Sequence, residues 1–117
     1  MSDFEPDFDV IVVGGGCAGS IVAYTLASAG KTVLVVERGQ YSGAKNMTGG
    51  RIYTHSLAQV FPDTWKEAPL QRKVAHERIS LMAPDSNFTI DFTSRELEED
   101  KNASYTVLRA PFDQGLA

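Results

Sequence analysis

Cysteine is nearly absent from this sequence, and its scarcity excludes several kinds of site. Cys17 is the single cysteine among 117 residues, so the chain cannot close an internal disulfide bond. One thiol also cannot supply the ligands of an iron–sulfur cluster or a zinc site. The two histidines, His55 and His76, lie 21 residues apart without a companion ligand. We therefore expect no metal ion and a reduced, cytoplasmic setting.

An excess of positive charge is missing as well. Lys and Arg number 11 against 15 Asp and Glu, which gives a formal net charge of -4. Nucleic-acid phosphates are bound by clustered basic side chains, so we expect no nucleic-acid partner. Hydrophobic residues make up 43% and charged residues 22%, as in a soluble globular protein with one small domain.

No segment has the pattern of a signal peptide or a membrane span. Met1 to Asp7 lacks a basic head followed by an apolar run. Val10 to Gly30 is uncharged for 21 residues, long enough to cross a bilayer, but it contains five glycines and several hydroxyl side chains. Its modest hydrophobicity disfavours insertion, so we expect no transmembrane segment.

The first third of the chain predicts a βαβ unit. Val10 to Val13 is a short β-branched run that ends at glycine, which is typical of a strand buried on both faces. Cys17 to Ser28 has apolar residues at helical spacing and is followed by Gly30 as a helix stop. Thr32 to Val36 predicts a second buried strand. Strand, helix and strand in this order indicate an α/β fold with a parallel pair.

The rest of the chain predicts shorter elements. Two strand-like segments, of which the second alternates apolar and polar residues, flank turn-forming residues, which indicates an antiparallel hairpin. We expect an extended loop at 38–54, a short helix at 55–61, hairpin strands at 74–82 and 88–92 around a turn at 84–87, a solvated loop or helical turn at 95–102, a strand at 105–108 and an unfinished segment from 112 onward.

The strongest motif is a glycine loop between the first strand and the helix. Gly14, Gly16 and Gly19 stand at G-x-G-x-x-G spacing. The first glycine makes the tight turn, the second lets the backbone approach a pyrophosphate, and the third lets the helix pack close to the strand. The helix start offers N–H groups to the phosphates. Gly15 and Cys17 belong to the same predicted cofactor-binding loop, in which we favour a small packing residue over a redox thiol for Cys17.

An acidic residue strengthens the motif. Glu37 ends the second strand 18 residues after Gly19, near the distance at which a carboxylate binds the ribose hydroxyls of a dinucleotide. FAD and NAD share this fingerprint. Ala23 as a small helix residue, Arg38-Gly39 after the acid, and the lack of a prompt second βαβ repeat favour FAD. A NAD-binding dehydrogenase domain and a non-catalytic nucleotide-binding module are the alternatives.

Three segments together resemble one flavoprotein family. They are the glycine loop with Glu37-Arg38-Gly39, the stretch from Gly43 to Tyr53, and Val107 to Ala110 followed by Phe112-Asp113. This set closely resembles the FixC-like flavoproteins, relatives of electron-transfer-flavoprotein:quinone oxidoreductase and, more distantly, of geranylgeranyl reductases. The resemblance extends from about Asp9 to Asp113. It implies an incomplete FAD domain of the glutathione-reductase type, with residues 1–117 as its N-terminal portion.

The resemblance also assigns cofactor-binding roles by position. Gly14, Gly16, Ala18 and Gly19 would face the pyrophosphate of FAD, and Glu37 the adenosine ribose. Arg38 would lie by the adenine side. The segment Thr48, Gly49, Gly50 and Arg51 would approach the flavin end, where paired glycines allow close backbone approach. Arg109 would reach the phosphate or ribityl region, because a guanidinium can fork onto phosphate oxygens.

The implied activity is electron transfer. The resemblance implies an FAD enzyme that passes electrons between an electron-transfer flavoprotein and a quinone or ferredoxin-like acceptor, in the cytoplasm or peripheral to the membrane. No catalytic side chain is assigned, because the cofactor carries the reaction. We expect a later acidic segment for the ribityl chain and a substrate-side domain to lie outside these 117 residues, and the isolated chain to lack competence as an enzyme.

Overall fold

The computed structural model describes residues 6–117. It begins with the expected βαβ unit: β1 (Val10–Val13), α1 (Cys17–Ser28) and β2 (Val33–Val36). The two strands are parallel, with Val10 opposite Val33 and Val13 opposite Val36. Residues 1–5, on which part of the signal-peptide prediction rests, lie outside the described residues.

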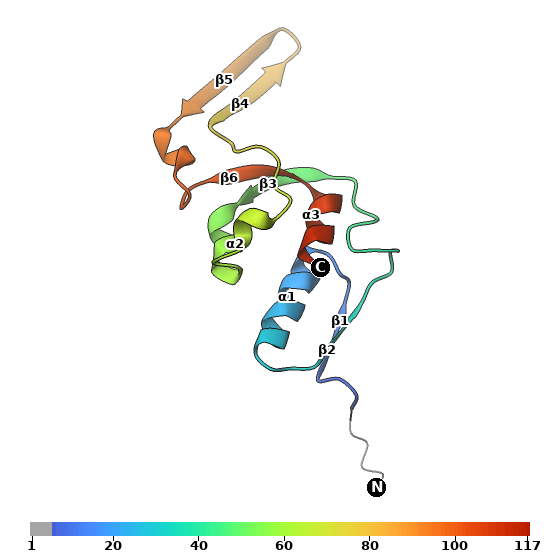
Figure 1. The fold of residues 1–117 in the computed structure, drawn as a ribbon. Coiled ribbons are helices and arrows are strands. Elements are labelled where there is room, and N and C mark those ends of the chain that lie inside the picture. The colour runs from blue at the N-terminus through green and yellow to red at the C-terminus, as the bar shows by residue number, and fades with distance from the viewer. Residues whose placement is uncertain (1–5) are drawn as a thin grey trace.

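Within the described residues the strand pair is covered on one face only, whereas its apolar runs are typical of strands buried on both faces. Burial alternates along β1, with Val10 and Val12 partly covered while Ile11 is 60% and Val13 is 86% exposed. Helix α1 packs against the pair on one side, as Figure 1 shows, and no second layer covers the other side within residues 6–117. A parallel pair needs cover on both faces, and here only one face has it.

The second part of the fold is an antiparallel pair that the sequence predicted only in part. β3 (Gly49–Tyr53) pairs with β6 (Ser104–Leu108), Gly49 lying opposite Leu108. The sequence indicated the second strand but placed 49–53 in a loop. Two adjacent glycines give no strand signal, and the pairing joins segments more than fifty residues apart.

The hairpin is longer than predicted. β4 (His76–Ala83) and β5 (Ser86–Thr93) pair along their whole length, so the turn consists of Pro84 and Asp85. Ser86 and Asn87, which we placed in the turn, extend β5 instead because their backbones pair with β4. Figure 1 shows this hairpin projecting from the body, at the end opposite the N-terminus.

Short helices complete the fold. α2 (Thr54–Val60) and η1 (Trp65–Glu67) follow β3, and η2 (Arg95–Glu98) follows the hairpin. α3 (Arg109–Leu116) follows β6 directly, where we expected only an unfinished segment from 112 onward, and Pro111 lies within its first turn. Proline lacks an N–H but is tolerated in the first turn, where no hydrogen bond is lost. Within residues 6–117 no helix is both long and apolar enough to cross a bilayer.

The core is small and lies where the second part meets α1. Leu57, Trp65, Val107 and Phe112 are buried together, and Cys17 and Ile52 pack against them. The contacts of Phe112 therefore attach α3, and through it the start of α1, to the β3–β6 pair. The arrangement places the N-terminus of α1 next to segments from the far end of the chain.

Candidate functional site

The turn from β1 into α1 depends on two glycines for structural reasons. Gly14 has a φ of +100°, a conformation that other residues rarely adopt, and its N–H donates to the carbonyl of Val36 at 2.7 Å. A Cβ at Gly19 would lie 1.9 Å from the carbonyl oxygen of Gly14. No side chain fits at that distance, so Gly19 is what allows α1 to begin so close to the strand.

Gly16 is different, because the protein itself does not require glycine there. Its φ of -72° is open to any residue, and a Cβ would meet only Asp113 Oδ2, at an ordinary 3.7 Å. Within residues 6–117 no side chain caps α1, and the first turn has no acidic residue. An uncapped helix start with open space beside Gly16 fits the pyrophosphate of a dinucleotide.

Glu37 lies directly after β2 and reaches back to the glycine loop. One carboxylate oxygen accepts a hydrogen bond from the N–H of Gly15 at 2.8 Å, and the other accepts from the N–H of Gly39 at 2.5 Å. The hydrogen bond from Gly39, and to a smaller extent the one from Gly15, lower the pKa of Glu37, because both stabilise the charged form of the carboxylate. The structure therefore holds an ionised acceptor beside the glycine loop. Arg38, by contrast, is exposed.

Arg109 lies on the other side of the loop, at the first residue of α3. Its Nε and Nη2 donate to the two oxygens of Asp113, each at 3.1 Å, and Nη2 also donates to Cys17 Sγ at 3.3 Å. Asn46 donates a third hydrogen bond to Asp113 from the loop before β3. Hydrogen bonding to Asp113 raises the pKa of Arg109. This cluster places the guanidinium against the first residue of α1.

A hollow of about 250 Å³ lies where these segments meet. It brings together residues that the sequence assigned to one site from three separate segments. They are Cys17 at the start of α1, Thr48, Gly49, Gly50 and Arg51 at the start of β3, and Arg109 at the start of α3. The N–H of Arg109 also donates to the carbonyl of Thr48 at 3.0 Å. A second hollow, of about 490 Å³, includes Gly15 and Glu37 among its lining residues.

Arg51 borders the first hollow but is held by protein groups. Its Nη2 donates to Glu77 Oε1 at 2.6 Å, its Nε donates to Ser104 Oγ at 2.8 Å, and its guanidinium lies 4.7 Å from the ring centre of Tyr53. The ion pair connects β3 to the base of the hairpin. Arg51 therefore has a structural role that the sequence did not reveal.

Two residues of the site were missed by sequence reasoning, Asp113 and Asn46. Both lay inside segments that the resemblance covered, but neither was given a role. The spacing of Arg109 and Asp113, one helical turn apart, was the available signal. This spacing alone did not indicate a helix, because Pro111 lies between the two residues and proline is a poor helix former. Asn46 gave no signal, since its partner lies 67 positions away.

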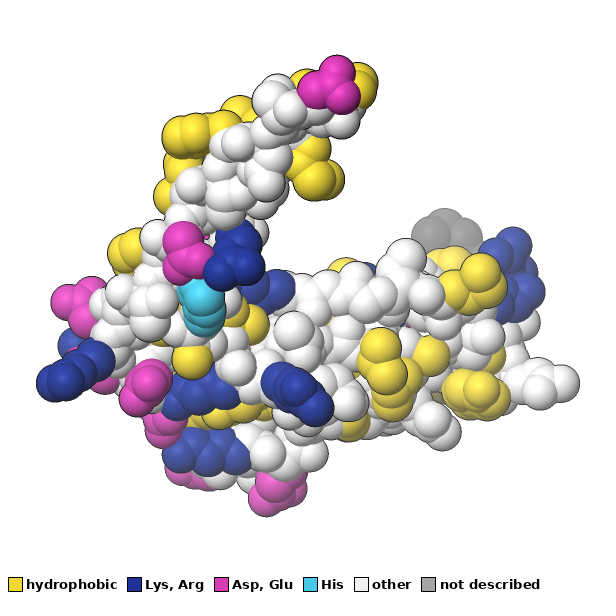
Figure 2. Space-filling view, turned by 90° about the horizontal axis from the view of Figure 1, so that it is seen from above, with side chains coloured by type: hydrophobic (Ala, Val, Ile, Leu, Met, Phe, Trp, Pro, Cys, Tyr) yellow, Lys and Arg dark blue, Asp and Glu magenta, His cyan; other side chains and the backbone are white. Residues whose placement is uncertain are grey.

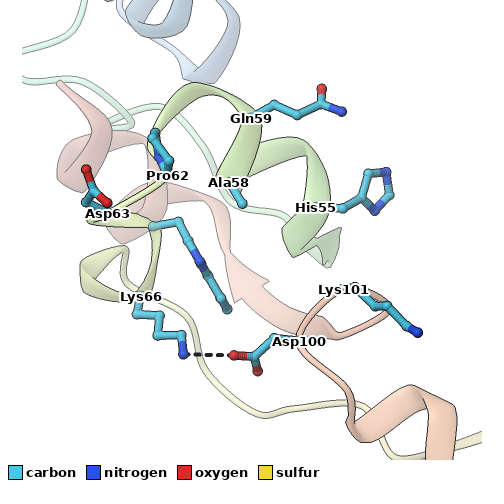
Figure 3. A pocket seen from close by; sticks show the side chains of 9 residues that line it. His55, Ala58, Gln59, Pro62, Asp63, Lys66, Asp100 and Lys101 are labelled. Carbon is cyan, nitrogen blue, oxygen red and sulfur yellow. Dashed lines mark hydrogen bonds and ion pairs between the residues drawn. The ribbon is translucent and has the colours of Figure 1, made fainter.

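A larger hollow, of about 610 Å³, lies elsewhere, between α2 and the turn before β6. Lys66 Nζ is held by Asp100 at 2.8 Å across it, and His55, Gln59 and Lys101 point to one side, away from this pair (Figure 3). Its polar groups do not converge on one point, so it does not resemble a binding site. Among residues 6–117 no group of three or more His, Cys, Asp or Glu side chains could hold a metal ion.

Comparison with known proteins identifies the family. The sequence pattern of the FAD dependent oxidoreductase family matches residues 9–104. Protein FixC of Salmonella typhi is 46% identical over 112 residues, which cover 96% of this chain and 26% of that protein. The probable electron transfer flavoprotein-quinone oxidoreductase YdiS of Escherichia coli is 49% identical over 116 residues, covering 99% and 27%. The chain thus spans about a quarter of the length of these relatives.

A solved structure shares the fold. The myxobacterial chondrochloren halogenase CndH, an FAD-dependent halogenase, superimposes with a TM-score of 0.68 and 26% sequence identity, over 93% of this chain and 25% of that one. The expected α/β fold, the FixC-like resemblance and FAD as the cofactor are confirmed by these matches. The chain belongs to the family of FAD-dependent oxidoreductases.

Proposed function

We propose that residues 1–117 are the N-terminal portion of a single FAD-binding domain. The loop Gly14–Gly19 holds the pyrophosphate, Glu37 binds the adenosine ribose, and Arg38 lies by the adenine. Thr48 to Arg51 approaches the flavin end. Arg109 binds the phosphate or ribityl region. FAD supplies the redox chemistry when bound, and the protein supplies binding, orientation and electrostatics.

One observation carries this proposal above the others. Gly16 has no steric or conformational reason within the protein to be glycine, yet it lies at the uncapped start of α1. Cys17, the next residue, borders the hollow that also includes Arg109 and Thr48 to Arg51. A bound phosphate explains the glycine at position 16, the uncapped helix start and the nearby Arg109, since it needs close backbone approach, N–H donors and a cation.

The test of the FAD site is the variant Gly16→Val. Valine fits the backbone at Gly16, so the protein should fold, but its methyl groups occupy the space of the pyrophosphate. In the polypeptide that carries this segment at the length of its relatives, we expect Gly16→Val to abolish FAD binding, because the side chain blocks the pyrophosphate sterically. The absorption spectrum of the released cofactor provides the measurement.

The matched control is Ser28→Val, an exposed position at the far end of the same helix. It adds the same side chain to α1 and should leave the flavin content unchanged. Full flavin content in Gly16→Val would show that the phosphate lies elsewhere. A nicotinamide spectrum in the released cofactor of the unaltered protein would favour the NAD-binding alternative.

We further propose that the whole protein passes electrons from an electron-transfer flavoprotein to a quinone. The relative YdiS, a probable electron transfer flavoprotein-quinone oxidoreductase, supports this choice of donor and acceptor, and a ferredoxin-like acceptor is the second choice. Reduced electron-transfer flavoprotein should lose its electrons to a water-soluble quinone when the protein is added, and Gly16→Val should abolish the transfer. Equal rates with and without the protein would contradict this activity.

A quinone acceptor also suggests where the protein acts. We propose a cytoplasmic protein that associates peripherally with the membrane, because quinones reside in the bilayer. Cell fractionation should then recover part of the protein with membranes and release it with carbonate. Complete recovery in the periplasm would contradict this location.

A further inference from the structure

The proposed function assigns no role to Asp113, although its environment is unusual. Its side chain is fully buried, and it is held by Arg109 and Asn46 from two different segments. A buried carboxylate is costly unless it is paired and hydrogen-bonded. The Asp113 carboxylate lies beside the glycine loop, within 4 Å of where a Cβ at Gly16 would lie.

The position of Arg109 also runs against helix stability. It is the first residue of α3, where the positive end of the helix dipole disfavours a cation. Asp113, one turn later, compensates by accepting from Nε and Nη2. Nη1 of Arg109 has no hydrogen-bond partner among residues 6–117, so that edge of the guanidinium still has N–H groups to donate.

We propose that Asp113 is a positioning residue for the cofactor: its buried carboxylate fixes the Arg109 guanidinium against the start of α1, with its unpaired edge available to a phosphate or ribityl oxygen. The pair is electrically neutral, so it brings Arg109 to the anion site without presenting a net negative charge there. This inference rests on the proposed FAD site and adds the residue that orients Arg109.

A positioning role and a purely structural role of Asp113 predict different FAD affinities in a double-mutant cycle with Arg109. If Asp113 acts through Arg109, then Arg109→Gln loses the contact with FAD and also leaves the buried carboxylate near the phosphate without a cation, with Asn46 as its remaining partner. Adding Asp113→Asn to Arg109→Gln removes that charge, so the double variant should bind FAD more tightly than Arg109→Gln alone. If Asp113 only supports the fold, the double variant should be the weakest of the set.

The experiment measures FAD affinity by fluorescence titration of the apoprotein, in the polypeptide at the length of its relatives. We expect Asp113→Asn to weaken binding about tenfold, Arg109→Gln about a hundredfold, and the double variant about tenfold. Asp100→Asn is the control, since its exposed carboxylate pairs with Lys66 outside the site, and its affinity should equal that of the unaltered protein.

The outcomes separate this inference from the proposed function. No FAD binding by the unaltered protein would overturn both. Normal FAD binding with purely additive losses, or with the double variant weakest, would overturn the role of Asp113 alone. If Asp113→Asn does not fold, Arg109→Lys decides. It keeps the charge but loses the two-point fork onto Asp113, so affinity equal to that of the unaltered protein would contradict positioning.

Discussion

At the scale of single residues, the site depends on the atoms that glycine lacks. A Cβ at Gly19 would lie 1.9 Å from a backbone oxygen, which cannot move without shifting the strand. We expect Gly19→Ala to lower the free energy of unfolding by about 1–3 kcal/mol through overpacking. Denaturant unfolding followed by circular dichroism provides the measurement.

Gly50 is the matched control for this prediction. A Cβ at Gly50 would meet no atom within 4 Å, and Gly50 does not have a positive φ. Gly50→Ala should therefore change the free energy of unfolding by less than about 0.5 kcal/mol. Equal losses for the two variants would show that helix packing does not depend on Gly19.

The site residues that the sequence predicts share one property: each belongs to a motif whose members lie close together in the chain. Gly14, Gly16 and Glu37 were found because their spacing is short and their order is fixed. Asp113 and Asn46 were not found, since their partnership joins the loop before β3 to the last helix. Arg51 was assigned to the cofactor, but its pairing with Glu77 across to the hairpin was not visible in the sequence.

At the scale of elements, the β4–β5 hairpin has two different faces. Ile79, Leu81, Phe88, Ile90 and Phe92 share one face, where paired residues lie opposite each other and every side chain is more than half exposed. The other face includes Asp91, which accepts from Arg78 and bonds with His76. Figure 2 shows hydrophobic side chains along this projecting arm.

We expect this apolar face to drive self-association of the 117-residue chain, since association removes exposed apolar surface from water. Phe88→Ser should reduce the associated fraction in sedimentation velocity runs. Met82→Ser, on the opposite face and 80% exposed, is the control and should have a much smaller effect. Equal effects would show that the face has no special role.

The elements also show why prediction succeeded unevenly. β1, α1 and β2 follow one another directly, and each has a clear local pattern, so the sequence sufficed. β3 has two glycines and becomes a strand only because β6 pairs with it. α3 has a proline within its first turn and is held by the burial of Phe112 and Asp113, which no local pattern reveals.

At the scale of the whole molecule, the chain is more extended than its length requires. Its radius of gyration is 19.2 Å, with extents of 73 × 34 × 23 Å, whereas a compact domain of this size has a radius of about 13 Å. Within residues 6–117 the strands form three separate pairs. The projecting hairpin joins the body through few contacts, among them the pair of Arg51 with Glu77.

We therefore expect the hairpin to open independently of the core. Native-state hydrogen exchange should give lower opening free energies for amides of β4 and β5 than for those of β6 around Val107, which is buried. Arg51→Gln should lower the hairpin values further while leaving those of Val107 nearly unchanged. A single common opening free energy would show that the chain unfolds as one unit.

The hydrogen bonds of Glu37 have a consequence for the entropy of binding. Two backbone N–H groups, from Gly15 and Gly39, already fix this carboxylate without any cofactor. Its rotamer freedom is therefore lost during folding, and a ribose that binds there need not freeze a mobile side chain. In the proposed site, recognition of the adenosine half is thus preorganised by the glycine turn itself.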